Sequence, residues 1–423
     1  MTETNERYAM GYDAIVVGAR CAGASTALLL ARAGHRVLML ERGRFPSDTM
    51  STHYLHTPAV ARLDRWGLLD ALRATGCPPM TRTRMGLAGI ALTGSPPPVD
   101  GIDTAYAPRR HVFDSLLAEA ATTAGAELRD GCTVTGLVEE NGRVVGVRAR
   151  SGGQEFTERA RIVIGADGMD SLVARTVDAP AYEEHPTLTC MYYTYWTGLD
   201  ADYEIYTNDH RGVGVSATHG GAVVIGVLWP RAEFDRVRHD VEREYLAAMR
   251  IAAPELADRV AGATREERFV GTGRLPNFFR QPYGPGWALV GDAGHHKDPV
   301  GGYGMSDALA HAELLASRVD QGLRGDRPME EALAEYAEER DRESMSRFQF
   351  NLEAAKLDPL PELLNVLRVV QGDQEQTDRF FGLLAGSVAM EEFFTEELIE
   401  KALAAAGVPD DDLAADPQPA PVG

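Results

Sequence analysis

Two glycines, an arginine and a glutamate near the amino terminus have the spacing of a nucleotide-binding turn. In YDAIVVGARCAGASTALLLARAGHRVLMLER (12–42), Gly18 and Gly23 take the first and third positions of the pattern G-x-G-x-x-G, and Arg20 replaces the second glycine. Glu41 ends the following apolar run, where an acidic residue binds ribose, and a helix N-terminus between the runs would hold phosphates. The segment predicts a dinucleotide site; the plainer alternative is an ordinary strand–helix–strand unit with a tight turn. We expect Arg20 to alter the site without abolishing it, because a cation near two phosphates is favourable.

Two later stretches add further glycine and aspartate motifs. Asp167-Gly168 follows the apolar run ARIVIGA and Gly291-Asp292 follows WALV, so each pair occupies a turn after an expected strand. The second stretch continues into a glycine-rich turn that opens a helix, with Pro299, Gly301, Gly302, Gly304 and Met305. With the first motif, these stretches resemble the DG and GD motifs of the FAD-dependent group A aromatic hydroxylases, the para-hydroxybenzoate hydroxylase-like family. The resemblance covers about residues 12–320 and has the family's motif order.

The resemblance implies roles for individual residues. The ADP half of FAD would be bound by Gly18, Arg20, Gly23, Glu41 and Arg42, with Arg110 contacting the cofactor and Val134 meeting adenine through its backbone. Asp292 would hydrogen-bond the ribityl chain, and Asp167 would link FAD with use of the nicotinamide cofactor. The turn from Gly301 through Gly304 to Met305 would follow the pyrimidine edge of the flavin, where helix N–H groups stabilise a reduced, anionic ring. The chain departs from the family at Ser306, usually asparagine, at His311, usually aspartate, and in the polar run HHKD at 295–298.

The family's chemistry implies an FAD-dependent monooxygenase that uses NAD(P)H and O2. NAD(P)H would reduce FAD, O2 would form a flavin C4a-hydroperoxide, and a hydroxyl would pass to an electron-rich small organic substrate. The alternative is an FAD-dependent reductase or dehydrogenase without oxygen insertion, such as a saturase of prenyl chains. A halogenase is disfavoured because the motif W-x-W-x-I-P is absent and the four tryptophans are isolated. One nucleotide-binding fold predicts bound FAD and a transient visit by NAD(P)H.

Candidates for the substrate pocket are fewer and weaker. His53, in the polar loop STHYLH (51–56), is the one candidate catalytic residue; the alternative is a histidine satisfied within the loop. Strand alternation in LTCMYYTYWTGL predicts that Tyr193 and Tyr195 share one face, and that Tyr192 and Trp196 share the other. One face would roof the flavin, although aromatic residues in such a strand are most often core.

These residues need a scaffold, and the pattern predicts an α/β fold. We expect a Rossmann-like FAD-binding domain of the glutathione-reductase type with an inserted antiparallel β-sheet substrate domain and a helical C-terminus. Asn141-Gly142 predicts a hairpin turn, and GVGVSATHGG at 212–221 is expected in a sheet, not in a second nucleotide site. The predicted bounds are 12–76, 105–179 and 285–325 for the FAD-binding domain, 77–104 and 180–284 for the substrate domain, 326–406 for the helical region, and 407–423 for a disordered tail.

Composition limits the partners. The formal net charge is -21 over 423 residues, which argues against nucleic acid or an anionic membrane surface. No run of eighteen apolar residues and no signal-peptide pattern occurs, and the four cysteines lack metal-binding spacing. We therefore expect a cytoplasmic protein without a metal, whose partners are a small-molecule substrate and O2.

Overall fold

The first sheet has a parallel core that places the amino-terminal turn at its carboxyl edge. The computed structural model describes residues 11–406, so the predicted tail at 407–423 lies outside the described residues. The core order is β18–β8–β1–β2–β5, and β17 pairs antiparallel with β18 at the edge. Their bounds are β1 Tyr12–Val17, β2 Val37–Leu40, β5 Glu127–Arg129, β8 Gln154–Gly165, β17 Tyr283–Gly284 and β18 Trp287–Leu289. Strands β1 and β2 are almost wholly apolar because helices and a hairpin cover both faces.

Helices cover one face of this sheet and a β-hairpin covers the other. Helices α1 (Cys21–Arg32), α4 (Arg110–Thr123) and α9 (Gly304–Arg324) share one apolar core. On the other face lie β6 (Cys132–Glu140) and β7 (Arg143–Ser151). Asn141 and Gly142 join them with φ of 51° and 74°, so the predicted hairpin turn is confirmed. Short helices complete this part: α2 (Thr57–Arg65), α3 (Leu69–Ala74) and α5 (Leu172–Thr176).

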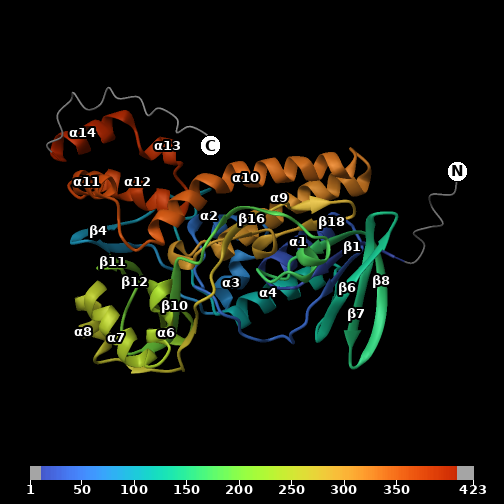
Figure 1. The fold of residues 1–423 in the computed structure, drawn as a ribbon, viewed down its shortest axis with the longest axis horizontal. Helices are drawn as coiled ribbons and strands as arrows, with labels where there is room; N and C mark the ends of the chain where they lie inside the picture. The colour runs from blue at the N-terminus through green and yellow to red at the C-terminus, as the bar shows by residue number, and fades with distance from the viewer. Residues whose placement is uncertain (1–10, 407–423) are drawn as a thin grey trace.

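The second sheet combines residues from two distant parts of the chain (Figure 1). Its order is β14–β10–β13–β12–β11–β3–β4, with β15 also on β10. The bounds are β3 Thr83–Leu87, β4 Ile90–Gly94, β10 Thr189–Thr197, β11 Tyr203–Asn208, β12 Arg211–Ala217, β13 Val223–Pro230, β14 Thr264–Arg265 and β15 Val270–Thr272. The pairing is antiparallel except between β11 and β3, which run parallel. Strand β12 confirms that GVGVSATHGG belongs to a sheet, apart from its last residues.

The two faces of β10 divide its aromatic residues as the alternation predicts. Tyr193 and Tyr195 belong to the apolar cluster with Leu228 and Leu357, whereas Trp196 and Tyr192 pack against α7 and its neighbours. The helices on that outer face are α6 (Phe234–Val237), α7 (Val241–Ala252) and α8 (Pro254–Val260). A third, small sheet links the two large ones through β9 (Ala181–His185), β16 (Asn277–Arg280) and β19 (His295–His296).

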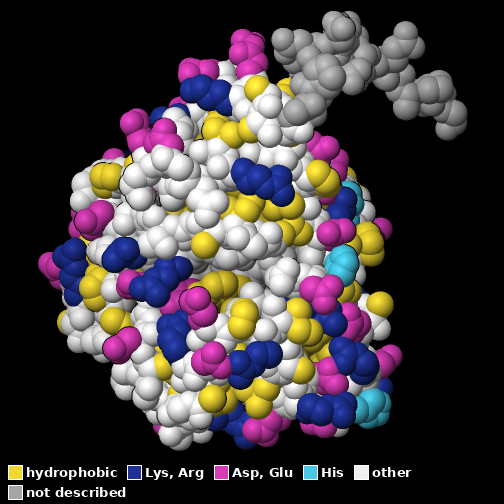
Figure 2. All heavy atoms as spheres, turned by 90° about the vertical axis from the view of Figure 1, so that its left-hand side faces the viewer, with side chains coloured by type: hydrophobic (Ala, Val, Ile, Leu, Met, Phe, Trp, Pro, Cys, Tyr) yellow, Lys and Arg dark blue, Asp and Glu magenta, His cyan; other side chains and the backbone are white. Residues whose placement is uncertain are grey.

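The carboxyl-terminal part is helical and reaches the second sheet. Figure 1 shows α10 lying alongside and above α9, and the remaining helices gathered over the second sheet. Figure 2 shows hydrophobic side chains gathered in the middle of the face that these last helices share with the second sheet. The bounds are α10 Met329–Ala354, α11 Pro361–Val370, α12 Gln374–Ala385, α13 Met390–Phe393 and α14 Glu396–Ala406. Side chains of α11, α12 and α14 share an apolar core with Met85, Ile90 and Leu92 of β3 and β4. None of the helices within residues 11–406 combines the length and apolarity needed to cross a membrane. The fold is thus α/β with mixed sheets, and the predicted domain boundaries stay predictions.

Candidate functional site: a nucleotide groove joined to an apolar cavity

A groove of about 540 Å³ runs along the carboxyl edge of the first sheet. Ten of the twelve predicted cofactor residues line it: Gly18, Arg20, Glu41, Arg42, Arg110, Val134, Asp167, Asp292, Gly304 and Met305. Gly23 and Gly301 do not. Residues separated by almost 290 positions in the sequence therefore meet along one surface, as the three motifs together predict.

The first turn depends on glycine for packing. Gly18 has a φ of 95°, and a Cβ there would collide with the carbonyl of Ala166. A Cβ on Gly23 would collide with the carbonyl of Gly18, so this glycine lets α1 start close to β1 although it lies beneath the groove. Glu41 is 5% exposed, and its carboxylate accepts hydrogen bonds from the amides of Ala19 (2.9 Å) and Gly43 (2.8 Å). Glu41 therefore fixes the turn itself, in addition to lining the groove.

A buried carboxylate holds two arginines at the groove. Asp114 is fully buried on α4, and its oxygens accept from both Nε and Nη2 of Arg110, each at 3.0 Å. The same carboxylate accepts from Arg20 Nη1 at 2.8 Å, while Arg20 Nη2 donates to Ser47 Oγ at 2.9 Å. Two positive guanidinium groups are thus oriented beside the start of α1. Arg20 fills the position of the missing glycine without blocking the groove, because its side chain extends to Asp114 and the loop at Ser47.

Two aspartates and the start of α9 complete the groove. Asp292 follows β18 and is exposed within the groove. Asp167 has one oxygen that accepts from the amide of Leu172 (2.6 Å) and one buried oxygen without a partner, and burial raises its pKa. A Cβ on Gly304 would have no other atom within 4 Å, so open space remains over the first turn of α9. That turn presents free backbone N–H groups to the groove.

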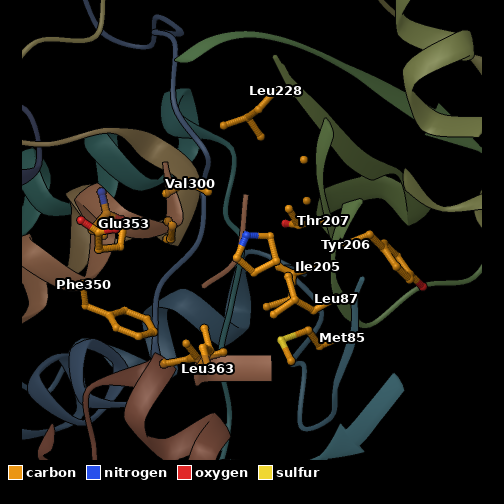
Figure 3. A pocket seen from close by; sticks show the side chains of 18 of the residues that line it. Met85, Leu87, Ile205, Tyr206, Thr207, Leu228, Val300, Phe350, Glu353 and Leu363 are labelled. Carbon is orange, nitrogen blue, oxygen red and sulfur yellow. The ribbon is translucent and has the colours of Figure 1, made fainter. Parts of the chain in front are cut away.

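A second cavity of about 540 Å³ adjoins the groove (Figure 3). The two share Ser51, Thr52, Met191 and Pro299 in their linings. Gly301 lines this second cavity, which explains its absence from the groove. Figure 3 shows apolar side chains of β3, β11 and β13 facing those of α10 and α11. They include Met85, Leu87, Ile205, Leu228, Phe350 and Leu363.

Aromatic residues crowd the end of the cavity nearest the groove. The rings of Tyr54 and Tyr203 stack with centroids 3.8 Å apart, and His56 stacks on Tyr303 at 4.9 Å. The carbonyl of Gly301 lies 3.0 Å from His56 Nε2, so that nitrogen carries the proton of the neutral ring. Burial lowers the pKa of His56 to about 4, which keeps the imidazole uncharged at neutral pH. Because each of the four side chains lines the cavity, they form an aromatic wall that carries no charge.

Comparison with known proteins identifies the family. A family model described as "FAD binding domain" matches residues 11–350. The chain belongs to this FAD-binding family. The match confirms the resemblance to the para-hydroxybenzoate hydroxylase-like flavoproteins, and it makes the chain a member of an FAD-dependent oxidoreductase family.

Proteins that are similar to this FAD-binding chain carry out different reactions. It is 28% identical to digeranylgeranylglycerophospholipid reductase 2 of Methanopyrus kandleri, over 86% of this chain and 94% of that protein. It is 27% identical to 6-methylpretetramide 4-monooxygenase of Streptomyces rimosus, over 74% of this chain and 76% of that protein. The solved structure of the flavin-dependent brominase Bmp2 has a TM-score of 0.78 and 18% identity, covering 94% and 99% of the two chains, which shows a shared fold.

The groove fits FAD by the chemistry of its lining. Two arginines and the start of α1 supply positive charge for a diphosphate, and Asp292 offers an exposed carboxylate as an acceptor. The open space over Gly304 leaves room for a ring beside the start of α9. A ring bound there would lie next to Gly302 and Tyr303, which line the apolar cavity. The individual contacts to FAD stay predictions.

His53 lines neither cavity, although Thr52 and Tyr54 beside it both line the apolar cavity. It is fully buried with a φ of 65°, and its Nε2 lies 2.8 Å from the hydroxyl of Tyr195. Burial lowers its pKa to about 3. It therefore packs under the second sheet, and its position adds no support to a catalytic role.

The sequence did not predict the aromatic wall. It also did not predict the contacts of Ser306 and His311, the two residues that depart from the family. Tyr54, Tyr203 and Tyr303 belong to three separate segments, and no spacing rule connects them. Ser306 Oγ accepts from the amide of His56 at 3.1 Å, so this departure positions a cavity residue. His311 Nε2 lies 3.0 Å from Ser344 Oγ and ties α9 to α10. The signal in the sequence was that Ser306 and His311 carry polar side chains that differ from those usual in the family.

Proposed function

We propose that the protein is an FAD-dependent monooxygenase that uses NAD(P)H and O2 to oxidise an electron-rich small organic molecule. The observation that carries the proposal is the apolar cavity that opens into the nucleotide groove beside the start of α9. A cavity of about 540 Å³ is in the range that binds small organic ligands. The relative that is a monooxygenase, at 27% identity, supports the same conclusion.

When bound, FAD supplies the redox chemistry, and the chain supplies orientation and exclusion of water. Met85, Ile205, Leu228 and Phe350 present apolar surface on opposite sides of the cavity, which keeps water from the reacting groups. The N–H groups at the start of α9 favour negative charge on a ring placed there. NAD(P)H enters as a transient donor in this proposal, since among the described residues only β1–α1–β2 has the full form of a dinucleotide site, in which a strand, a glycine turn and a helix lead into an adjacent parallel strand.

A reductase without oxygen insertion is the second candidate, favoured by the 28% identity to digeranylgeranylglycerophospholipid reductase 2 over nearly the full length of that protein. The two functions differ in their need for O2, because saturation of a double bond consumes reduced flavin without oxygen. The aromatic wall favours the first function, since it suits a planar ring better than a flexible chain.

The test compares aerobic and anaerobic turnover of the FAD-loaded protein with NADH or NADPH. We expect 2-naphthol, used as a phenolic probe, to stimulate O2 consumption, and its hydroxylated product to carry label from ¹⁸O2. The proposal fails if the probe accelerates no O2 uptake while digeranylgeranylglycerophospholipid in detergent is saturated without O2. A variant with a filled cavity, Leu363→Trp, should lose probe stimulation and keep its flavin. Leu364→Trp, one residue along α11 and outside the cavity lining, is the matched control.

A further inference from the structure

The charged residues of the cavity all have the same sign. Its charged lining residues are Glu353, Asp358 and Glu362, and no lysine or arginine lines it within the described part of the chain. Glu353 is paired with Lys356 at 2.7 Å, and all three residues are exposed: Glu353 on α10, Glu362 on α11 and Asp358 in the segment between these helices. His56 adds no positive charge at neutral pH. A carboxylate or phosphate entering this cavity would therefore lose water without gaining a cation.

The cations nearest the aromatic wall already have a partner. Lys297 Nζ lies 4.7 Å from the centre of the Tyr303 ring, and the Arg347 guanidinium lies 5.4 Å from it. Both pair with Asp307, Lys297 at 2.6 Å and Arg347 at 3.5 Å. Neither residue lines the cavity, and Lys297 is buried with its side chain 4% exposed. The two cations share one carboxylate, which offsets only part of their charge, and both side chains lie outside the cavity lining, so neither is placed to pair directly with a bound anion.

The wall contains three tyrosine hydroxyl groups, and those of Tyr54 and Tyr203 can act as partners for a polar group of a ligand. Tyr54 and Tyr203 line the cavity, and no hydrogen bond joins either hydroxyl to another group within residues 11–406. Burial raises the pKa of both phenols, so they stay protonated and donate. The side chains are held by stacking on each other and by the edge contact of Tyr54 with His56 at 4.6 Å. A neutral hydroxyl or carbonyl group can pair with these hydroxyls at the groove end of the cavity.

We infer that the cavity takes an uncharged aromatic or polycyclic molecule that bears a hydroxyl or carbonyl group, which Tyr54 and Tyr203 bind. Carboxylates and phosphates are rejected for lack of a cation. This inference rests on the proposed function for the chemistry at the groove, and it extends that function to the substrate class. It also separates this chain from an enzyme of anionic phospholipids.

The experiment measures binding to the oxidised, FAD-loaded protein without NAD(P)H, so it does not depend on which reaction follows. The probes share one tricyclic skeleton: 9-phenanthrol, phenanthrene and phenanthrene-9-carboxylate, followed by their fluorescence and by the flavin spectrum. We expect 9-phenanthrol to bind at least about 100-fold more tightly than the carboxylate at pH 7.5. Equal or tighter binding of the carboxylate overturns the inference, as does failure of both uncharged probes to bind.

Two sets of variants assign the effect to named groups. Tyr54→Phe and Tyr203→Phe keep the stacked rings and should each weaken 9-phenanthrol by about 2- to 13-fold, the value of one hydrogen bond, while leaving phenanthrene unchanged. Unchanged 9-phenanthrol affinity in both variants overturns the role of the hydroxyls. Leu363→Arg adds a cation to the lining and should raise carboxylate affinity, whereas Leu364→Arg should not. If oxygen consumption fails while these preferences hold, the proposed reaction is wrong and the substrate class stands.

Discussion

Replacing Asp114 by asparagine tests whether one buried carboxylate organises the nucleotide groove. The substitution keeps the size of the side chain and removes the charge that pairs with Arg20 and Arg110. Arg110 is 11% exposed, so it is left as a nearly buried cation without a carboxylate. Breaking a buried ion pair by removing one partner costs about 3–5 kcal/mol. With an unfolding entropy of about 2.1 cal/mol/K per residue, a chain of 423 residues would lose about 3–6 °C in Tm.

The assay is thermal unfolding of the purified protein, with the flavin content of each sample recorded. Asp70→Asn is the control, because Asp70 forms an exposed pair with Arg73, and water screens such a pair so that it contributes little to stability. A fall in Tm for Asp114→Asn no larger than that of the control would refute the reasoning. Arg20→Gln should destabilise the native protein more than it destabilises the Asp114→Asn variant, since the variant no longer has the ion pair to lose.

Three other changes give sharp expectations. In Gly304→Ala, the added methyl group has no other atom within 4 Å, so the free energy of unfolding should stay the same or rise by about 0.5–1 kcal/mol. The same methyl group projects into the groove and should lower the ratio of flavin to protein. Asp292→Ala should lower the amount of flavin retained on dialysis, because the substitution removes an exposed carboxylate from the groove. A normal flavin content would contradict the assignment of Asp292 to cofactor binding. Burial lowers the pKa of His311 to about 3 in the folded protein, whereas the pKa of an unfolded histidine is about 6.5. The neutral His311 side chain therefore contributes its full stability above pH 6.5, and this contribution is lost as the pH falls toward 3. His311→Gln should therefore show a smaller fall in Tm between pH 7 and pH 5 than the native protein, and an unchanged fall would contradict this.

The nucleotide half of the site could be predicted from the sequence because local rules govern it. A glycine turn between a buried strand and a helix has one geometry, so Gly18, Glu41 and Asp292 could be placed before any coordinates were known. The role of Asp114 was not predictable in the same way, because its two arginine partners lie 94 and 4 positions away and only the packing of α1 on α4 joins them. Arg20 was expected to alter the site without abolishing it; the structure places it in the groove lining, and its effect on the cofactor stays a prediction.

The substrate half could be predicted only in outline. The sequence periodicity predicted the sheet that contains β10 to β13. It also correctly placed Tyr193 and Tyr192 on opposite faces of β10. It could not indicate that β3 would join β11 in parallel, because such a contact spans more than a hundred residues. His53 was singled out for its type, and its burial against Tyr195 is a property of tertiary packing that composition does not carry.

The part of the chain that the FAD-binding family model covers ends at Phe350, within α10. Beyond that residue, α11, α12 and α14 still contribute side chains to the cavity, among them Leu363, Phe380 and Ala402. The residues of the nucleotide groove therefore all precede Phe350, whereas the cavity is lined by residues from both sides of it. Mutations in α11, α12 and α14 can change which molecule binds in the cavity, while the residues that line the nucleotide groove stay the same. Sequence similarity measured over the first 350 residues consequently covers the whole nucleotide groove but only part of the cavity lining.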